Sequence, residues 1–331
     1  MNCTGAEVDY RHDVVHHQPK WNREERQERE VNSYRRFSLC LRDSVASSVL
    51  PMLDLDFHTL DSIISVALQE DLGFGDITTQ AVVSPNTKAR GEFIAKQDFV
   101  LAGWPVVVRT FHLVSEKIVV ESAIRDGDAI AKGRIFGNVA GPAARLLSGE
   151  RVALNFLQRL SGIATLTRQF VEAVSGTGTT ILDTRKTTPG LRTLEKYAVR
   201  MGGGRNHRFG LSDGVLIKEN HIAAAGGVAE AIRRARANID HLKKIEIEVT
   251  TFDELNQALD AGADAILLDN MTPGQAKEAV QRAGSRVSLE VSGGIHLGNV
   301  CQYALTGVDF ISVGALTHSF KSVDISLELK M

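Results

Sequence analysis

The stretch DAILLDNMTPGQAKEAVQRAGSRVSLEVSG (264–293) decides the fold of this chain. It opens with an apolar run typical of a buried strand, continues with a helical pattern, and ends in a second apolar run, VSLEV. Runs rich in Val, Ile and Leu are typical of parallel strands that helices cover on both faces. Two parallel strands joined by a helix form a right-handed βαβ unit. The stretch therefore predicts an α/β fold.

The same alternation of strand and helix runs through the chain from residue 178 onward. Helical patterns at 226–237, 251–262 and 273–284 lie between strand-like runs. The six runs are TTILDT (179–184), GVLIKEN (214–220), KKIEIEV (243–249), DAILLDN (264–270), VSLEVSG (287–293) and DFISVG (309–314). Six units are fewer than the usual eight, so we expect an incomplete, six- or seven-stranded α/β barrel. A doubly wound open sheet is the alternative.

The part of the chain before the barrel has a different pattern. Helical spacing at 56–73 is followed by short strand patterns, which predict a smaller α+β open sandwich domain with an antiparallel sheet. The strand patterns are at 89–96, 117–124 and 135–141. A long apolar helical stretch at 148–174, with Gly162 as an internal weak point, is expected to connect the two domains.

Residues 1–51 are rich in charge and poor in periodic apolar residues, so burial cannot offset their ordering entropy. We expect them to form a disordered N-terminal extension, with Met52 as a candidate start. The expected organisation is this extension (1–51), the α+β sandwich domain with its connecting helix (52–165), the α/β barrel domain (166–317), and a C-terminal segment that returns towards the N-terminal domain (318–331).

The composition argues against several classes of function. The chain has 331 residues, is 43% hydrophobic and carries a net charge of −2, so we expect no nucleic-acid partner. The longest apolar stretch, FVLAGWPVVV (99–108), is about half a membrane span, so we expect no membrane partner. The three cysteines are far apart, which predicts neither a disulfide framework nor a zinc cluster and favours a cytoplasmic protein.

Polar side chains follow every strand-like run at its carboxyl end. In an α/β barrel these ends and the loops after them form the rim that carries the active site. One polar residue at a strand end also arises because such ends are solvated, but polar groups at all six ends together indicate a functional site. These groups are Asp183 to Lys186, Lys218 to His221, Glu246, Glu248, Asp269, Asn270, Ser292 to Gly294, and Gly314.

The rim divides into parts of different chemistry. Glycines after the last two strands let backbone N–H groups approach an anion, which predicts a phosphate site at Ser292, Gly293, Gly294 and Gly314. Turn geometry alone is the other explanation for glycines at these positions.

Two acids, Glu248 and Asp269, lie one βα unit apart and are expected on neighbouring strands. Facing an anion site, they indicate Mg²⁺ and the hydroxyl groups of a ribose between them. The alternative is a structural ion pair with Lys243 or Lys244.

Cations gather in the loop GGGRNHRFG (202–210) and at the first two strand ends. These residues are Arg185, Lys186, His207, Arg208 and Lys218. Cationic side chains usually lie on a solvated surface, but several of them in one glycine-rich segment that is poor in acids indicate a multiply charged ligand. Arginine offers a planar fork that matches carboxylates, and lysine offers a point charge suited to phosphates. The sequence therefore predicts a site for a small polyanion.

These residues belong to a series of motifs that resembles the quinolinate phosphoribosyltransferase family, the carboxylating nicotinate-nucleotide pyrophosphorylases. The resemblance runs from about residue 69 to the C-terminus, and Met201 and Glu219 are mild departures from it. The motifs are ERVALNFLQRLSGIAT (150–165), DTRKTTPGLRTLEKYAVRMGGGRNHRFGLSDGVLIKENHI (183–222), ILLDN (266–270), EVSGGI (290–295) and ISVGALTHS (311–319).

The resemblance implies a homodimer, or a higher oligomer, in which Arg151 enters the cavity of the neighbouring subunit. It implies that Arg151, Arg185, His207, Arg208 and Lys218 hold the carboxylates of quinolinate. Substrate binding is also implied for Thr184, and Lys186 is implied to face 5-phosphoribosyl 1-pyrophosphate. The resemblance also implies that Glu248 and Asp269 bind the ribose and Mg²⁺. The residues implied to bind the 5′-phosphate are Ser292, Gly293, Gly294 and Gly314. The implied catalytic residues are Lys186, Lys218, Glu248 and Asp269.

The implied activity is phosphoribosyl transfer to quinolinate with decarboxylation, a pentosyltransferase step of de novo NAD biosynthesis. Its products are nicotinate mononucleotide, pyrophosphate and CO₂. Two alternatives stay open at this point. One is a related transferase that acts on another pyridine or azole acid, and the other is a non-catalytic phosphoribosyl-binding barrel.

Overall fold

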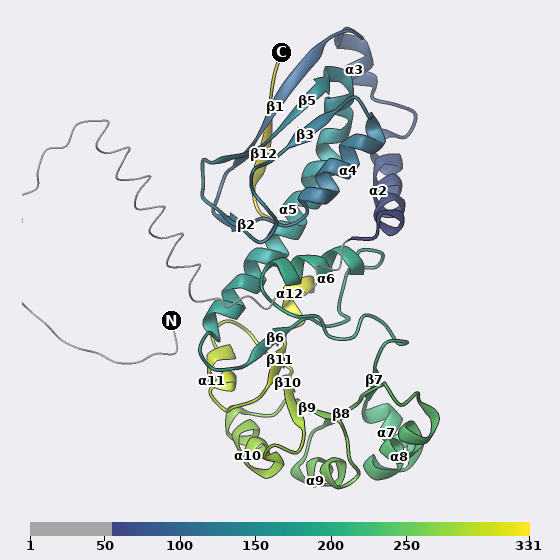
Figure 1. Cartoon of the computed structure of the whole chain (residues 1–331), viewed down its shortest axis with the longest axis vertical. Coiled ribbons are helices and arrows are strands. Elements are labelled where there is room, and N and C mark those ends of the chain that lie inside the picture. The colour runs from purple at the N-terminus through teal and green to yellow at the C-terminus, as the bar shows by residue number, and fades with distance from the viewer. Residues whose placement is uncertain (1–54) are drawn as a thin grey trace, which may run out of the picture. The chain divides into compact units, whose positions relative to one another are not determined.

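Two main sheets organise residues 55–331, the part of the chain that the computed structural model describes (Figure 1). One is parallel with six strands, the other is antiparallel with four strands, and a small two-stranded sheet, β2-β4, accompanies them. This arrangement confirms the predicted fold class, an incomplete α/β barrel plus a smaller antiparallel domain. The predictions for residues 1–51 and for Met52 lie outside the described residues.

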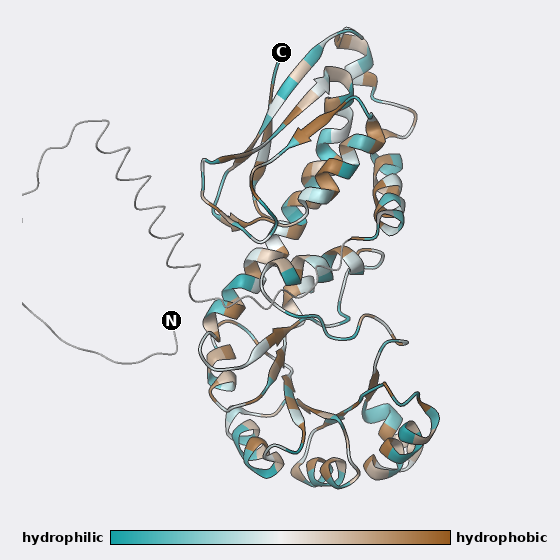
Figure 2. Ribbon diagram, viewed as in Figure 1, coloured by the Kyte–Doolittle hydropathy of each residue, from teal (hydrophilic) through white to brown (hydrophobic). Residues whose placement is uncertain are grey.

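The parallel sheet contains all six strands predicted for the barrel. Its order is β6-β11-β10-β9-β8-β7, so Glu248 and Asp269 lie on neighbouring strands, as expected. The strands are β6 (Thr180–Leu182), β7 (Val215–Ile217), β8 (Ile245–Val249), β9 (Ala265–Asp269), β10 (Ser288–Ser292) and β11 (Phe310–Ser312). Ile247, Ile266 and Val291 are fully buried, and Figure 2 shows the apolar character of these strands.

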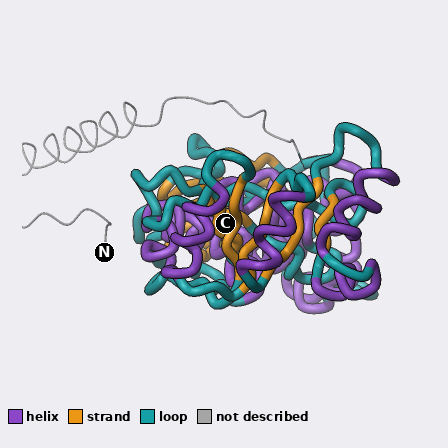
Figure 3. The backbone as a smooth tube through the Cα atoms, turned by 90° about the horizontal axis from the view of Figure 1, so that it is seen from below, coloured by secondary structure: helices purple, strands orange, loops and turns teal. Residues whose placement is uncertain are grey.

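Helices connect the strands and lie outside them, as Figure 1 shows for α8, α9 and α10. Figure 3 shows the helices, strands and loops of the chain from below, in different colours. Local sequence fixes where two of them begin: Thr251 starts α9 with a capping box, and Thr272 starts α10 with another, followed by Pro273. The helices are α6 (Arg192–Met201), α7 (Glu219–Ala225), α8 (Val228–Asn238), α9 (Phe252–Asp260), α10 (Pro273–Ala283), α11 (Val300–Ala304) and α12 (Ala315–His318).

The barrel is open between β6 and β7, the two edges of the sheet. Arg205 forms an isolated parallel bridge with Leu182, so the loop 202–210 occupies part of this opening. The backbone N–H of Arg205 donates to Ile181 O at 2.9 Å, and that of Asp183 donates to Arg205 O at 3.1 Å. The bridge brings the cation-rich loop to the carboxyl end of β6.

The smaller domain is built on an antiparallel sheet of order β12-β1-β5-β3. Its C-terminal strand pairs with β1 along Arg90↔Lys330 to Ala95↔Ile325, so the last residues of the chain lie in the first domain's sheet. The elements are α2 (Phe57–Leu72), α3 (Ile77–Val82), β1 (Lys88–Ala95), β2 (Phe99–Val100), α4 (Trp104–Val114), β3 (Val119–Glu121), β4 (Ala129–Ile130), β5 (Ile135–Pro142) and β12 (Ile325–Lys330).

The helix α5 (Ala143–Ala173) joins the two domains and differs from its prediction in two ways. It begins directly after Pro142, before the predicted start at 148, because Ala143 and Leu146 are already buried. It also continues through Gly162, where a Cβ atom would lie 2.3 Å from Lys321 O. This glycine therefore permits a close chain crossing and is no weak point. The predicted boundary at 165/166 falls inside the helix.

Two further findings concern the chain as a whole. No helix within residues 55–331 is both long and apolar enough to cross a lipid bilayer. Cys301 is disulfide-bonded, whereas the spacing of the cysteines predicts no disulfide framework. Spacing along the chain does not show which cysteines the fold brings together.

Candidate active site

A cavity of about 510 Å³ lies at the carboxyl ends of the barrel strands. Every residue predicted for the site lines it, except Arg151 and Gly314. The predicted residues in its wall are Thr184, Arg185, Lys186, His207, Arg208, Lys218, Glu248, Asp269, Ser292, Gly293 and Gly294. The wall also contains Asn270, which the sequence analysis places on the rim without a role. Four further residues of the wall, Leu216, Leu267, Glu290 and Ser312, are ones that sequence reasoning did not assign to the site.

Two arginines supply the cationic wall of the cavity. The Nε atoms of Arg185 and Arg208 are buried and have no hydrogen-bond partner among the described residues. Burial, and then the charge of Arg185, hold the pKa of the Arg208 guanidinium below its usual value. Arg208 Nη1 donates to Gly214 O at 2.9 Å, so the remaining N–H groups of the two arginines are the donors available to an acceptor in the cavity.

A buried ion pair below the cavity fixes the loop that carries His207 and Arg208. Lys196 from α6 donates to the Asp183 carboxylate, and both residues are almost completely buried. Asp183 also accepts from the His207 backbone N–H at 2.9 Å, and Lys196 Nζ donates to His207 O at 3.1 Å. Asn206 adds a hydrogen bond to Asp183 at 2.6 Å. The ion pair thus fixes both the backbone N–H and the backbone C=O of His207.

The acidic wall comes from β8 and β9. Glu248 forms an ion pair with Lys218, and Asp269 Oδ2 accepts from Asn270 Nδ2 at 2.8 Å. The alternative partner Lys243 instead donates to Ser212 O, so it does not pair with Glu248. Two carboxylates from neighbouring strands in one polar cavity are a donor set that suits a hard divalent cation together with oxygen ligands of a substrate.

The glycine wall follows β10. Gly293 has φ 95°, and a Cβ atom there would lie 2.1 Å from Asn270 Oδ1, so no other residue fits beside Asn270 without a shift. Gly314 is outside the lining but close to it, because a Cβ atom there would lie 3.1 Å from Lys186 Cδ. Thr317 Oγ1 donates to Lys186 O at 2.8 Å and fixes the main chain of this lysine.

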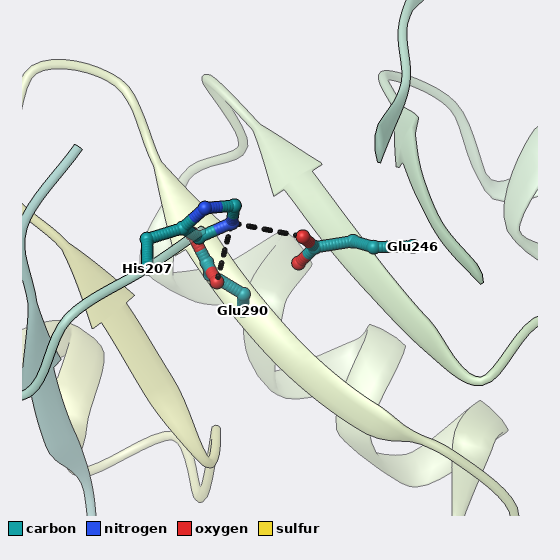
Figure 4. A group of neighbouring side chains, drawn as sticks. All are labelled: His207, Glu246 and Glu290. Atoms are coloured by element: carbon teal, nitrogen blue, oxygen red, sulfur yellow. Dashed lines mark hydrogen bonds and ion pairs between the residues drawn. The ribbon is translucent and has the colours of Figure 1, made fainter. Parts of the chain in front are cut away.

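A buried cluster of His207, Glu246 and Glu290 lies at the inner end of the site (Figure 4). His207 Nε2 lies 2.9 Å from Glu246 Oε2 and 3.8 Å from Glu290 Oε2. Burial works to lower the pKa of His207, but the hydrogen bond to Glu246 and the charge of that acid raise it overall. The three ligand atoms lie within 4.8 Å of one another, which also meets the spacing of a metal site.

The sequence contained a signal for Glu290 that was not used. Side chains alternate between the two faces of a strand, so Glu246 and Glu248 in IEIEV share one face, as do Glu290 and Ser292 in SLEVS. Because Glu248 and Ser292 were already predicted to face the site, their neighbours two positions earlier had to face the same side. Alternation could therefore have added Glu290 to the predicted site, together with a role for Glu246, which the strand-end pattern already places on the rim.

Arg151 lies exposed on α5 and is not part of the cavity wall in the described part of a single chain. Its predicted role requires a second chain. A larger hollow of about 960 Å³ lies over the antiparallel sheet, but charges there pair with each other, as Lys330 and Glu92 do at 2.8 Å. Among the described residues, the barrel cavity is therefore the stronger candidate for chemistry.

Comparison with protein families gives two matches that together span most of the described chain. The model described as "Quinolinate phosphoribosyl transferase, N-terminal domain" matches residues 76–161, and the model of the C-terminal domain of the same enzyme matches residues 163–328. The two matches meet inside α5.

Individual proteins and solved structures agree with this result. A probable nicotinate-nucleotide pyrophosphorylase [carboxylating] of Bacillus subtilis (strain 168) is 46% identical, covering 79% of this chain and 90% of its own. The enzyme of that name from Mycobacterium leprae (strain TN) is 44% identical, covering 83% and 99%. The crystal structure of NadC from Streptococcus pyogenes superposes with a TM-score of 0.81 at 41% identity, covering 84% and 98%.

Proposed function

The chain belongs to the quinolinate phosphoribosyltransferase family, and we infer from this that the barrel cavity is where its phosphoribosyl transfer takes place. The enzyme transfers the phosphoribosyl group of 5-phosphoribosyl 1-pyrophosphate to quinolinate with loss of CO₂. The products are nicotinate mononucleotide, pyrophosphate and CO₂, in de novo NAD biosynthesis. The observation that carries the location is that one cavity joins two arginines, whose Nε atoms have no partner among the described residues, to a pair of carboxylates from neighbouring strands.

We propose that the cationic wall holds the two carboxylates of quinolinate. Arg185 and Arg208 are suited to this because their buried Nε donors point to no other described group. Lys218 lies in the same wall, with His207 beside Arg208. Arg151 of the partner subunit would complete the wall. Arginine forks match carboxylates in geometry as well as in charge.

The opposite walls suit the phosphoribosyl donor. Glu248 and Asp269 would bind the ribose hydroxyl groups, and Thr184 and Lys186 would face the donor. Backbone N–H groups at Ser292, Gly293, Gly294 and Gly314 would hold the 5′-phosphate. Mg²⁺ fits Glu248 and Asp269, because it is usually bound through one or two carboxylates plus oxygens of the substrate. When bound, it supplies charge that neutralises the pyrophosphate.

The residues contribute mainly by position and charge. Cleavage of the ribose C1–O bond leaves its electron pair on pyrophosphate, whose negative charge Lys186 stabilises. The walls hold the pyridine nitrogen against the ribose carbon, where it forms the new C–N bond. The quaternary nitrogen then accepts the electron density released when the C–CO₂ bond breaks, and a proton is added to the ring carbon. Lys218, His207 and water are candidates for the proton donor.

An assay of the purified protein with quinolinate, 5-phosphoribosyl 1-pyrophosphate and Mg²⁺ tests the function directly. Formation of the mononucleotide together with CO₂ is expected. A comparison of CO₂ release with quinolinate and with nicotinate separates this activity from that of a transferase for another pyridine acid. Such a transferase would need fewer cationic side chains around the base. Binding of both substrates without turnover would instead indicate a non-catalytic barrel.

Replacement of Arg208 by lysine keeps the charge but removes the planar fork. We expect kcat/KM for quinolinate to fall about 10-fold or more, which corresponds to about 1.5 kcal/mol or more. Steady-state kinetics with saturating 5-phosphoribosyl 1-pyrophosphate measure the change. Arg233→Lys is the matched control, because Arg233 is exposed on α8 and pairs with Glu230. Equal values for Arg208→Lys and the control would contradict the role of the fork.

The homodimer with shared active sites has its own test. Arg151→Ala and Arg185→Ala are each expected to be poorly active alone. A mixed dimer, however, has one cavity with its own Arg185 and an intact Arg151 from the partner subunit. Random mixing of the two variants should therefore restore about a quarter of the wild-type activity. Mixing that restores nothing would show that Arg151 does not act across subunits.

Location and other partners remain predictions from composition. We propose a cytoplasmic enzyme without nucleic-acid or membrane partners, which is supported by the near-neutral charge of the chain. Fractionation of cells that produce the full chain measures the location. Recovery of the enzyme with the membrane fraction would contradict it.

A further inference from the structure

Glu290 is a buried acid that the reaction scheme above does not use. It lies in the middle of β10, is only 3% exposed, and lines the barrel cavity. Its Oε1 atom is buried and has no hydrogen-bond partner among the described residues. A polar atom in this state is costly unless a ligand completes its hydrogen bonding. Glu290 Oε1 therefore has a hydrogen bond to offer to a ligand of the cavity.

The neighbouring His207 shows which groups of the cluster already carry protons. The backbone N–H of Arg208 donates to His207 Nδ1 at 2.8 Å, so this ring nitrogen is an acceptor. The ring proton is therefore on Nε2, which lies 2.9 Å from Glu246 Oε2 and donates to it. Glu246 Oε2 is then the acceptor of this bond. The direct contact between Nε2 and Oε2 also leaves no room for a metal ion between them.

Glu290 is left as the group that takes up a proton. Two carboxylates in one cluster repel each other when both are ionised, so the more buried of them is the one more readily protonated. The one that is almost fully buried is Glu290, and burial followed by the charge of Glu246 raises its pKa to about 8. A hydrogen bond from Ser312 on β11 to the same carboxyl group works to lower this pKa, whereas a hydrogen bond with Glu246 adds to the rise. The other charged groups in the cavity wall are Arg185, Lys186, Arg208, Lys218, Glu248 and Asp269.

We propose that Glu290 binds the substrate as a neutral acid, with its Oε1–H donating a hydrogen bond to a carboxylate oxygen of quinolinate. The proposal rests on the function inferred above. A negative charge on Glu290 would repel a dicarboxylate, whereas the protonated group adds a donor to the cavity that Arg185 and Arg208 also line. Burial in a weakly polar site is a general way to keep a carboxylic acid neutral so that it can donate a hydrogen bond.

The proposal makes quinolinate binding depend on pH. The form that binds is the protonated one, so affinity is lost as the pH rises through the value at which free Glu290 ionises. With ionisation near pH 8, about one tenth of the enzyme is protonated at about pH 9, and KM for quinolinate rises about tenfold from neutral pH.

Glu290→Gln tests this dependence, because glutamine keeps a donor of the same shape at every pH. We expect KM for quinolinate to rise above pH 8 in the wild type and to stay constant in Glu290→Gln. The control Glu278→Gln, at an exposed position on α10, should follow the wild type. Parallel rises in the wild type and in Glu290→Gln would overturn the proposal. Absence of quinolinate turnover in the wild type at neutral pH would instead refute the inferred function.

A calorimetric measurement on the wild type avoids any folding defect of the variant. Quinolinate is added at about pH 9 in buffers of different ionisation enthalpy, and the number of protons taken up is obtained from the difference in heat. Uptake that approaches one proton at this pH, and that vanishes near pH 6, is expected. Binding without proton uptake at about pH 9 would overturn the proposal.

Discussion

Replacement of Arg185 by alanine is expected to reduce kcat/KM for quinolinate by about 100-fold or more, or about 2.7 kcal/mol or more. The Arg185 guanidinium lies in the cavity wall, and its buried Nε has no partner among the described residues. Removal of this charge leaves a substrate carboxylate in a partly dehydrated cavity without its partner. Most of the loss should appear in KM, because the carboxylate is bound in the ground state as well as in the transition state.

The matched control is Arg282→Ala, which removes an exposed arginine that pairs with Glu278 on α10. Kinetics of both variants are measured at saturating 5-phosphoribosyl 1-pyrophosphate, with thermal unfolding as a check of folding. Arg282→Ala should leave kcat/KM unchanged. If Arg185→Ala also left it unchanged, the cationic wall would not be the quinolinate site.

Replacement of Lys196 by methionine is expected to lower the free energy of unfolding by about 3–5 kcal/mol. The Lys196 side chain is 4% exposed and that of its partner Asp183 is fully buried, so the variant leaves an uncompensated carboxylate in the core. The bond from Lys196 Nζ to His207 O is lost as well. Denaturant unfolding followed by circular dichroism measures the change.

Lys330→Met is the control for this prediction. It makes the same substitution in an ion pair with Glu92, but the Lys330 side chain is 67% exposed, so a cost below about 1 kcal/mol is expected. Equal losses in the free energy of unfolding in Lys196→Met and Lys330→Met would show that the buried ion pair stabilises the fold no more than the exposed one. Because Lys196 holds the loop of His207 and Arg208, we also expect a higher KM for quinolinate in the fraction of Lys196→Met that stays folded.

Much of the fold could be read from local patterns. Each βα unit of the barrel carries its own signals, such as the apolar run of β9 and the capping box at Thr272. The start of α5 was harder to predict, because what extends it to Ala143 is burial against residues distant in sequence. Gly162 was misread for the same reason: the chain that crosses it, at Lys321, is far away in sequence.

The chemistry of the site was predictable where residues follow strand ends in order. Arg185, Glu248 and Asp269 were found because parallel strands place their carboxyl ends at one rim. The buried pair of Lys196 and Asp183 was missed, because nothing in the local pattern of α6 shows that Lys196 faces inward. Cys301 is a similar case, since its disulfide depends on approach in space.

The sequence by itself determined the order of strands and helices, the identity of most residues around the cavity and the family to which the chain belongs. Only the tertiary structure decided which of these groups meet: the tautomer of His207, the partner of Glu248, and the burial that leaves Glu290 holding a proton. The physical reason is the distance along the chain over which each kind of interaction acts. Propensity, capping and alternation act between neighbours in the chain, whereas desolvation and charge interaction depend on distances that only the folded chain defines.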